Sequence, residues 1–361
     1  MLTIFTPTFN RKHFLLKLYQ SLLAQTCQDF TWLLIDDGST DGTDLLVQSW
    51  ITENQINIRY IYQQNGGKMR AHNHAVELCE TEFFLCIDSD DSLVEDAVEV
   101  ILKTWGQAGV DGNRFPGRNI QELADQIEGP GAENATLTAK TEEAEDINRK
   151  PITENRNLTD PKRKPKDPKR KPTDPKRKSE EQLRKGALAG LVAYKGKSPT
   201  ETMHGEHFPP GLTTSTLSNL YRKGFQGETT LVFRTEILRQ HPFPEFPGEK
   251  FIPEAVLYDQ IDQDHELLLI PKVLTLCEYH PDGLTAGVRR IRRENPRGWL
   301  YYYQQRISRE PWGILRYKYL VHAVCFAWQV HESVFGCISA GKFEILTAVP
   351  AAVLFRLVGR L

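Results

Sequence analysis

The chain has 361 residues, of which 40% are hydrophobic and 25% charged. This composition is typical of a protein that buries a sizeable core, and it excludes fibrous and wholly disordered classes. The formal net charge of −2 hides an asymmetry, because ten Lys or Arg residues face three Asp residues between Thr159 and Ser179. One short tract is therefore strongly basic, and the rest of the chain is acidic.

The cysteine pattern and the N-terminal sequence indicate in which cellular compartment the protein is expected. The six cysteines show no CxxC spacing, which argues against a zinc site or a disulfide framework and favours a reducing compartment. Residues 1–6 form a short apolar run without a basic leader or a cleavage site, so they predict a first strand and not a signal peptide. No stretch of 18 uncharged apolar residues predicts a membrane span, and we expect a cytoplasmic protein.

Strand and helix patterns alternate through the first hundred residues. Alternation of this kind indicates right-handed βαβ units, so we predict an α/β fold with a mostly parallel sheet and helices on both faces. Asn10 is the expected N-cap of the first helix. Apolar runs predict strands at 2–6, 30–35, 56–62 and 83–87, and helical spacing predicts helices after Asn10 and over 43–53, 68–79 and 93–105.

The pattern stops near residue 107. Residues 159–179 contain three heptads with the sequence DPKRK, and their five prolines exclude a coiled coil. We interpret 107–186 as a low-complexity basic insertion that is mostly disordered. The tract lacks the aromatic residues and the recognition helix of nucleic-acid modules, so no specific nucleic acid is expected.

Order returns behind the insertion. Apolar runs predict strands at 188–194, 229–234, 266–270 and 273–279, and a helix over 254–261. Residues 1–106 and 187–285 are therefore expected to form one α/β domain. Residues 286–361 form a C-terminal region that is basic and aromatic at first and apolar later, which predicts a helical extension.

Three polar clusters follow predicted strands. Ligands bind beyond the carboxyl ends of parallel strands, and these ends carry TPTFNR at 6–11, DDGSTD at 36–41 and DSDD at 88–91. Each acidic cluster taken singly is a common helix-capping turn. Two of them at one sheet edge would repel each other without a cation, and hard carboxylate oxygens suit Mg²⁺ or Mn²⁺.

Together with NGGKMRAHN at 65–73, these motifs resemble the nucleotide-binding half of family 2 glycosyltransferases of bacterial type, which have the GT-A fold. The resemblance is strong over 1–106 and moderate over 187–285. It implies that the loop residues Thr6, Pro7 and Phe9 pack around the nucleoside. It also implies that Asp37, or its neighbour Asp36, accepts a hydrogen bond from the base.

The same resemblance assigns the other residues that are expected to bind the nucleotide-sugar donor. Lys68, with Arg70 as the alternative, lies where the family has a basic residue near the diphosphate. Asp88 and Asp90 match the part of the DxD-type motif that holds the nucleotide sugar, and Asp90 and Asp91 are the expected ligands of Mn²⁺ or Mg²⁺. Spacing alone leaves open which of Asp88, Asp90 and Asp91 binds the ion.

The transfer reaction also needs a general base. The family's base is an Asp or Glu before an apolar helix, and Glu254 in PEAVLYDQI has that place, although Pro253 departs from the commoner pattern of two adjacent acids. The alternative is that Glu254 only caps a helix. Asp259 is a weaker competitor. His280 could approach the diphosphate but is more simply a solvated loop residue, and His72 and His74 receive no ligand role.

The tail suggests contact with a membrane. Nine basic and two acidic residues alternate with aromatic residues between Arg289 and Lys318, and short apolar runs follow at 321–328 and 345–355. This pattern is typical of a peripheral element in the headgroup region, here on the cytoplasmic face through 289–361. The alternative is a helical cap that packs on the α/β domain.

The expected activity is metal-dependent, inverting transfer of a sugar from a nucleotide-diphosphate donor, UDP-linked by expectation, to a saccharide or lipid-linked acceptor in surface glycan synthesis. A catalytically degenerate GT-A-like protein tethered to a polyanion is one alternative. A nucleotidyltransferase of similar fold is another, but TPTFNR lacks the glycines of its phosphate loop.

Overall fold

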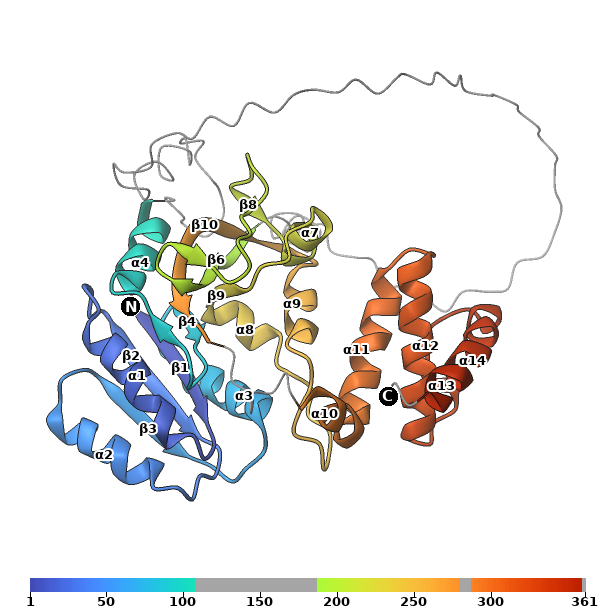
Figure 1. The fold of residues 1–361 in the computed structure, drawn as a ribbon, viewed down its shortest axis with the longest axis horizontal. Coiled ribbons are helices and arrows are strands. Elements are labelled where there is room, and N and C mark those ends of the chain that lie inside the picture. Colours follow the sequence, from blue (N-terminus) through green and yellow to red (C-terminus); the bar gives the residue numbers. More distant parts are fainter. Residues whose placement is uncertain (108–186, 279–286, 359–361) are drawn as a thin grey trace, which may run out of the picture.

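The structure is a computed structural model that describes residues 1–107, 187–278 and 287–358 (Figure 1). Apart from Gln107, the predicted basic insertion at 107–186 lies outside the described residues, and so do its DPKRK repeats and His280.

The first part of the chain alternates strands and helices as predicted. In chain order these are β1 (Leu2–Thr8), α1 (Lys12–Leu23), β2 (Phe30–Asp36), α2 (Thr43–Glu53), β3 (Ile58–Tyr62), α3 (Lys68–Leu78), β4 (Phe83–Cys86), β5 (Ser92–Leu93) and α4 (Ala97–Gln107).

The chain then continues within the same sheet and ends in helices. The sheet-forming part comprises β6 (Ala187–Ser198), β7 (Glu201–Thr202), β8 (Thr214–Ser215), α7 (Leu217–Arg222), β9 (Thr229–Arg234), α8 (Thr235–Gln240), α9 (Ala255–Ile261) and β10 (His265–Leu276). The helical part comprises α10 (Val288–Glu294), α11 (Pro296–Arg309), α12 (Ile314–Gln329), α13 (Val334–Cys337) and α14 (Lys342–Leu357).

One sheet with the strand order β3-β2-β1-β4-β9-β6-β10-β5 joins both segments of the α/β domain. Parallel pairing joins β1 with β2 and β4, β2 with β3, and β6 with β10. The predicted α/β class with a mostly parallel sheet is thus confirmed. Strand β9 is antiparallel to both neighbours, β4 and β6, and connects the two parallel blocks.

The order of the first four strands determines where the helices lie. The chain moves outward from β1 to β3 and then returns past β1 to β4, so right-handed crossovers put α1 and α2 on one face and α3 on the other. Strand β1 is buried along nearly its whole length because both of its faces are covered. The carboxyl ends of β1, β2 and β4 therefore open toward the same edge of the sheet.

Three local predictions are corrected. Asn10 is not the N-cap of α1: the cap is Arg11, and Asn10 adopts a left-handed conformation with φ 52°. The predicted strands at 266–270 and 273–279 are one strand, β10, because an irregularity between Ile270 and Val273 accommodates Pro271. The helix expected from residue 93 begins only at Ala97, since Ser92–Leu93 pair with β10.

The C-terminal helices have a hydrophobic core of their own. Trp299 and Tyr303 of α11 pack with Phe326 of α12, and Ile345 and Ala348 of α14 complete the cluster. Figure 1 shows this helical part beside the sheet domain, with α11 next to α9. No helix within the described ranges is both long and apolar enough to cross a membrane.

Candidate functional site

The loop after β1 is tied to the acidic turn after β2. The backbone N–H of Asn10 donates to Ser39 Oγ at 2.8 Å, and Asn10 Oδ1 accepts from the backbone N–H of Thr40 at 2.8 Å. Arg11 Nη1 lies 2.6 Å from Asp90 Oδ2. The three polar clusters that the sequence placed at strand ends are therefore in direct contact.

Asp36 and Asp37 are buried, and both carboxylates accept hydrogen bonds from other residues of the chain. Asp36 accepts from the hydroxyl of Tyr60 at 2.7 Å and from the backbone N–H of Ser39. This contact, together with burial, raises the pKa of Tyr60. Asp37 accepts from the backbone N–H groups of Gly66 and Gly67 at 2.9 and 2.7 Å, and so fixes the glycine turn that leads into α3.

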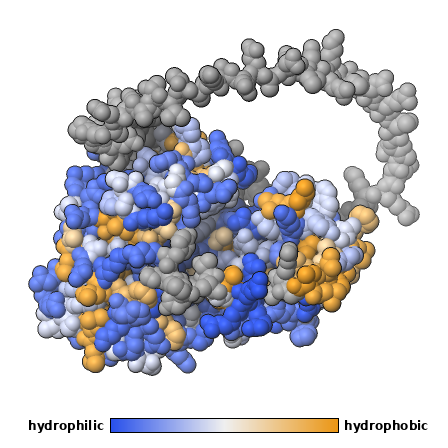
Figure 2. Space-filling model, viewed as in Figure 1, coloured by the Kyte–Doolittle hydropathy of each residue, from blue (hydrophilic) through white to orange (hydrophobic). Residues whose placement is uncertain are grey.

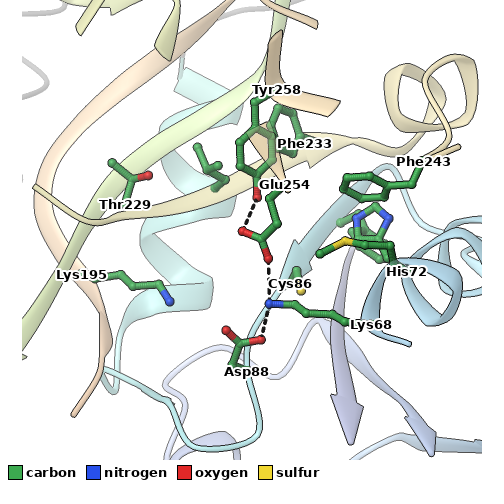
Figure 3. A pocket seen from close by; sticks show the side chains of 13 residues that line it. Lys68, His72, Cys86, Asp88, Lys195, Thr229, Phe233, Phe243, Glu254 and Tyr258 are labelled. Carbon is green, nitrogen blue, oxygen red and sulfur yellow. Dashed lines mark hydrogen bonds and ion pairs between the residues drawn. The ribbon is translucent and has the colours of Figure 1, made fainter. Parts of the chain in front are cut away.

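Lys68 connects the two halves of the domain (Figure 3). Its ammonium nitrogen lies 2.6 Å from Asp88 Oδ1, after β4, and 2.7 Å from Glu254 Oε1, before α9. The hydroxyl of Tyr258, one turn along α9, donates to Glu254 Oε2 at 3.3 Å. The structure thus brings together three residues that the sequence singled out from distant segments, around a cavity of about 70 Å³.

The charges in this cluster stabilise one another. Burial opposes ionisation, but the ammonium of Lys68 holds the pKa of Asp88 at about 2. The same ammonium lowers the pKa of Glu254. The two carboxylates in turn outweigh burial and raise the pKa of Lys68. Glu254 is therefore an ionised carboxylate, which is the form that a general base needs.

Lys195 is a residue of this site that sequence reasoning missed. It follows the apolar run of β6 and lines the cavity (Figure 3). Its ammonium lies 2.7 Å from Asp91 Oδ2. Burial raises the pKa of Asp91 to about 6 even with this partner. A lysine that directly follows the apolar run ALAGLVAY within one strand was the available signal, because such a residue needs a carboxylate partner when buried.

The structure separates the two basic candidates near the diphosphate. Lys68 points into the cavity, whereas the exposed Arg70 lies over Gly66 and 3.8 Å from Glu245. Thr6 is buried, and its hydroxyl accepts from the indole N–H of Trp32, while Phe9 is exposed beyond β1. Pro7 lies between them in β1.

His72, His74 and Asp259 make contacts that stabilise the fold. His72 is packed edge-on against Phe84 and Phe243, and burial lowers its pKa to about 4. His74 binds Gln63. Asp259 is buried, with one oxygen 2.7 Å from Arg306 of α11, and so is oriented away from the cavity.

The loop before Glu254 is fixed by the C-terminal helices. Asn295 Oδ1 accepts from the backbone N–H groups of Lys250 and Phe251 at 2.7 and 3.0 Å. The carboxylate of Glu249 accepts from the backbone N–H groups of Arg297 and Gly298 in the first turn of α11. Between this loop and the start of α3 lies a groove of about 380 Å³, which shares Met69 with the smaller cavity.

The carboxylates of DSDD differ in their suitability as metal ligands. The side chains of Asp88 and Asp90 are 39% and 20% exposed, and their partners Lys68 and Arg11 are long side chains that can move aside. Asp91 is 7% exposed and is held by Lys195. The carboxylate oxygens of Asp88 and Asp90 are hard donors that suit Mg²⁺ or Mn²⁺. Asp91 is less suited, because it is buried and already paired with Lys195. Across the described residues, no three His, Cys, Asp or Glu side chains are already gathered as a metal site.

Comparison with known proteins agrees with this arrangement. Residues 3–167 match the family described as glycosyl transferase family 2. The chain is 37% identical over 102 residues to chondroitin synthase of Escherichia coli, and 34% identical over 105 residues to the teichoic acid poly(glycerol phosphate) polymerase of Staphylococcus epidermidis. These matches cover 28% and 29% of this chain but only 15% of either relative.

A solved structure has the same fold along most of the chain. S. aureus TarS 1–349, solved in complex with UDP-GlcNAc, aligns with a TM-score of 0.50 at 13% identity, over 96% of this chain and 79% of that one. At this identity the likeness concerns the fold alone. The family match thus assigns residues 3–167 to a glycosyl transferase family 2 region, and the relatives and the shared fold support a family 2 glycosyltransferase of bacterial type.

Proposed function

We propose that the protein is an inverting, metal-dependent glycosyltransferase that moves a sugar from a nucleotide-diphosphate donor, UDP-linked by preference, to a hydroxyl of a saccharide or lipid-linked acceptor in surface glycan synthesis. One observation carries the proposal: Lys68 contacts Asp88 of the donor half and Glu254 of the acceptor half at the same time. A diphosphate bound next to Asp88 and an acceptor hydroxyl that approaches Glu254 would lie on either side of this ammonium.

Glu254 is the proposed general base. Its carboxylate would take the proton of the acceptor hydroxyl while that oxygen attacks the anomeric carbon from the face opposite the diphosphate. The bond from the anomeric carbon to the diphosphate oxygen breaks, and the nucleoside diphosphate leaves with the bonding electrons. A single displacement of this kind inverts the configuration. Tyr258 holds the second oxygen of Glu254 and would orient the carboxylate.

The donor would lie along the carboxyl ends of β1, β2 and β4. Thr6, Pro7 and Phe9 are proposed to contact the nucleoside, with Asp37 or Asp36 as acceptor for its base. Asp37 also shapes the turn at Gly66 and Gly67, whose backbone leads to Lys68. We propose that Lys68, and not Arg70, neutralises the diphosphate, because only Lys68 faces Asp88.

A divalent Mn²⁺ or Mg²⁺ is proposed at the carboxylates of Asp88 and Asp90. When bound, it would act as a Lewis acid that stabilises the charge of the leaving diphosphate. Arg11 would then lose its contact with Asp90 and become free to bind a phosphate oxygen.

The acceptor is proposed to enter through the groove beside residues 244–252. This groove carries Phe246 and Phe251 together with charged side chains, and it shares Met69 with the cavity that Glu254 lines. Its volume of about 380 Å³ falls within the range of about 300–1,000 Å³ that small-molecule sites occupy. We further propose that the protein works as a peripheral protein at the cytoplasmic face of the membrane.

A thermal-shift panel of nucleotide sugars with and without Mn²⁺ tests this function. We expect one donor to raise the melting temperature, and to raise it further when the metal is present. A degenerate binding protein would show no metal-dependent shift with any donor. A nucleotidyltransferase would respond to nucleoside triphosphates in preference to nucleotide sugars.

A further inference from the structure

Helix α14 is apolar on two opposite faces. Ile345, Ala348 and Ala352 form the buried face and pack in the core of the C-terminal helices. Phe343, Leu346, Leu354 and Leu357 follow the helical repeat on the opposite face and are exposed, Phe343 by 78% and Leu357 by 79%. A helix with apolar side chains on opposite faces is normally covered on both, and the outer face of α14 has no such cover among the described residues.

The exposed face continues onto the start of α12. Arg316 Nη2 lies 3.1 Å from Glu344 Oε2, and the hydroxyl of Tyr317 donates to the carbonyl oxygen of Thr347 at 2.8 Å. These contacts hold the first turns of the two helices together, which brings the exposed Trp312 and Ile314 to the end of α14 that carries Phe343. We call the set Trp312, Ile314, Phe343, Leu346, Leu354 and Leu357 the apolar face. Figure 2 shows hydrophobic side chains gathered over this helical part.

Basic side chains flank the apolar face. Lys318 is exposed one turn after Ile314, Lys342 is exposed one turn before Leu346, and Arg356 is exposed next to Leu357. Glu344 is the only acidic residue in the two helices, and Arg316 neutralises it. Within these two helices, the charged side chains around the apolar face are therefore predominantly basic.

These properties suit the surface of a bilayer with anionic lipids. Helix α14 has 16 residues with Pro350 inside, which makes it about 24 Å long, and about 20 apolar residues are needed to cross the hydrocarbon core. A helix of this kind lies in the plane of the interface, with its apolar side chains among the headgroups and its cations near the lipid phosphates. Two copies of the chain joined face to face would instead bring Lys318, Lys342 and Arg356 against like charges.

The sequence indicated the basic and aromatic zone at 289–318 as the membrane contact. In the structure, only part of this zone is exposed. Trp299 and Tyr303 are buried in the helical core, and Arg306 and Arg309 both approach Asp259. Much of that zone thus holds the C-terminal helices to the α/β domain. The exposed apolar side chains lie at the end of that zone, at Trp312 and Ile314, and further along the chain in α14.

We propose that the apolar face, with Lys318, Lys342 and Arg356 around it, docks the protein onto a membrane that contains anionic lipids. The inference rests on the proposed peripheral location and specifies its surface and the lipid charge. It would hold a lipid-linked acceptor and the enzyme on the same two-dimensional surface.

Vesicle flotation of the full chain tests this surface. We expect the protein to float with phosphatidylcholine vesicles that contain phosphatidylglycerol and to remain largely free with phosphatidylcholine alone. The double variant Leu354→Ser, Leu357→Ser should lower binding at least about tenfold, because two largely exposed leucines no longer enter the interface. Leu45→Ser on α2 is the matched control, since Leu45 is 73% exposed far from this face.

A charge variant tests the electrostatic part. Lys318→Gln with Lys342→Gln should lower binding to anionic vesicles at least about tenfold, since each cation near the surface contributes roughly 1 kcal/mol. Lys223→Gln, exposed at the end of α7, should leave binding unchanged. No flotation of the wild type, or flotation that the leucine variant leaves intact, would overturn the proposal. Loss of a dimer in the leucine variant without vesicle binding would assign the face to a second copy.

The test separates this inference from the proposed function. Donor-dependent thermal shifts are measured on the same samples and do not involve the apolar face. A normal donor shift without flotation would reject only the docking surface, and flotation without any donor shift would reject only the transferase assignment.

Discussion

The ammonium nitrogen of Lys68, at the first residue of α3, lies 2.7 Å from a carboxylate oxygen of Glu254, just before α9. The two residues come from the two segments of the sheet domain, 1–107 and 187–278, and Asp88 shares the same ammonium at 2.6 Å. This contact couples the proposed base to the place where the diphosphate would bind, because a phosphate oxygen next to Asp88 would compete for the cation that Glu254 now contacts.

Replacement of the proposed base should abolish transfer. Glu254→Gln keeps the shape of the side chain but removes the proton acceptor, so we expect turnover to fall by about 10²–10⁴-fold. Donor-dependent thermal shifts should persist. Glu77→Gln, an exposed residue near the end of α3 that lines neither the cavity nor the groove, is the control and should retain activity. Turnover of the Glu254 variant at the wild-type rate would show that Glu254 is only a structural residue.

Lys68 and Arg70 should differ in their effect on the donor. Lys68→Met removes the cation that faces Asp88, and we expect the dissociation constant of the nucleotide sugar to rise about 10- to 100-fold, as for the loss of a charged hydrogen bond. Arg70→Met should change it less than about twofold, because Arg70 points toward Glu245. Isothermal titration with both variants measures the difference. Equal losses would mean that the diphosphate also contacts Arg70, which would contradict the proposal.

Gly67 should be irreplaceable on steric grounds. Its φ is +92°, and a Cβ built there would lie 1.9 Å from the carbonyl oxygen of Lys250. Gly67→Ala must therefore displace the loop before Glu254, and we expect the free energy of unfolding to fall by about 3 kcal/mol and activity to fall with it. Gly248→Ala is the matched control: its φ is +81° but its Cβ would meet no atom within 4 Å. That variant should lose only about 1 kcal/mol in a urea titration.

Lys195 should matter for stability as well as for the site. Lys195→Met leaves Asp91 buried without its partner, and such a broken pair costs about 3–5 kcal/mol in the free energy of unfolding. Lys197→Met, two residues along β6, removes an exposed pair with Glu201 and should cost less than about 1 kcal/mol. Chemical denaturation of the two variants makes the comparison. Similar losses would mean that Asp91 is not desolvated as the structure has it.

Acid should weaken the helical part through His322. Burial, with Arg292 nearby, lowers the pKa of His322 to about 4. The folded chain thus keeps His322 neutral, while the unfolded chain takes up a proton below about pH 6.5. The stability that His322 contributes is present above pH 6.5 and is lost as the pH falls toward 4. The melting temperature should therefore drop between pH 7.5 and pH 5.

His322→Phe should reduce that drop, since a phenyl ring can keep the stacking on Tyr303 without a titrating nitrogen. His13→Gln, at an exposed position, should leave the drop unchanged. Part of the acid sensitivity will persist in the His322 variant because His72 has a similarly lowered pKa in the other core. An unchanged drop in the His322 variant would contradict the prediction.

The sequence by itself determined the order of elements in the first half and the residues that end its strands. Apolar periodicity and βα alternation are local signals, and α2 spans Thr43–Glu53 as they predict. Because parallel strands point the same way, the polar ends of β1, β2 and β4 had to share one edge. The convergence of Asp37, Asp88 and Lys68 followed from that rule and from the family resemblance.

Only the tertiary structure decided the contacts between segments distant in sequence. Nothing local in the chain shows that β9 enters antiparallel between β4 and β6, that Lys195 meets Asp91, or that Asn295 holds the loop before Glu254. Side-chain direction separated Lys68 from Arg70, since both lie in the first turn of one helix. The same holds for the tail, where composition indicated an interfacial region, but packing determined which apolar side chains are buried and which face solvent.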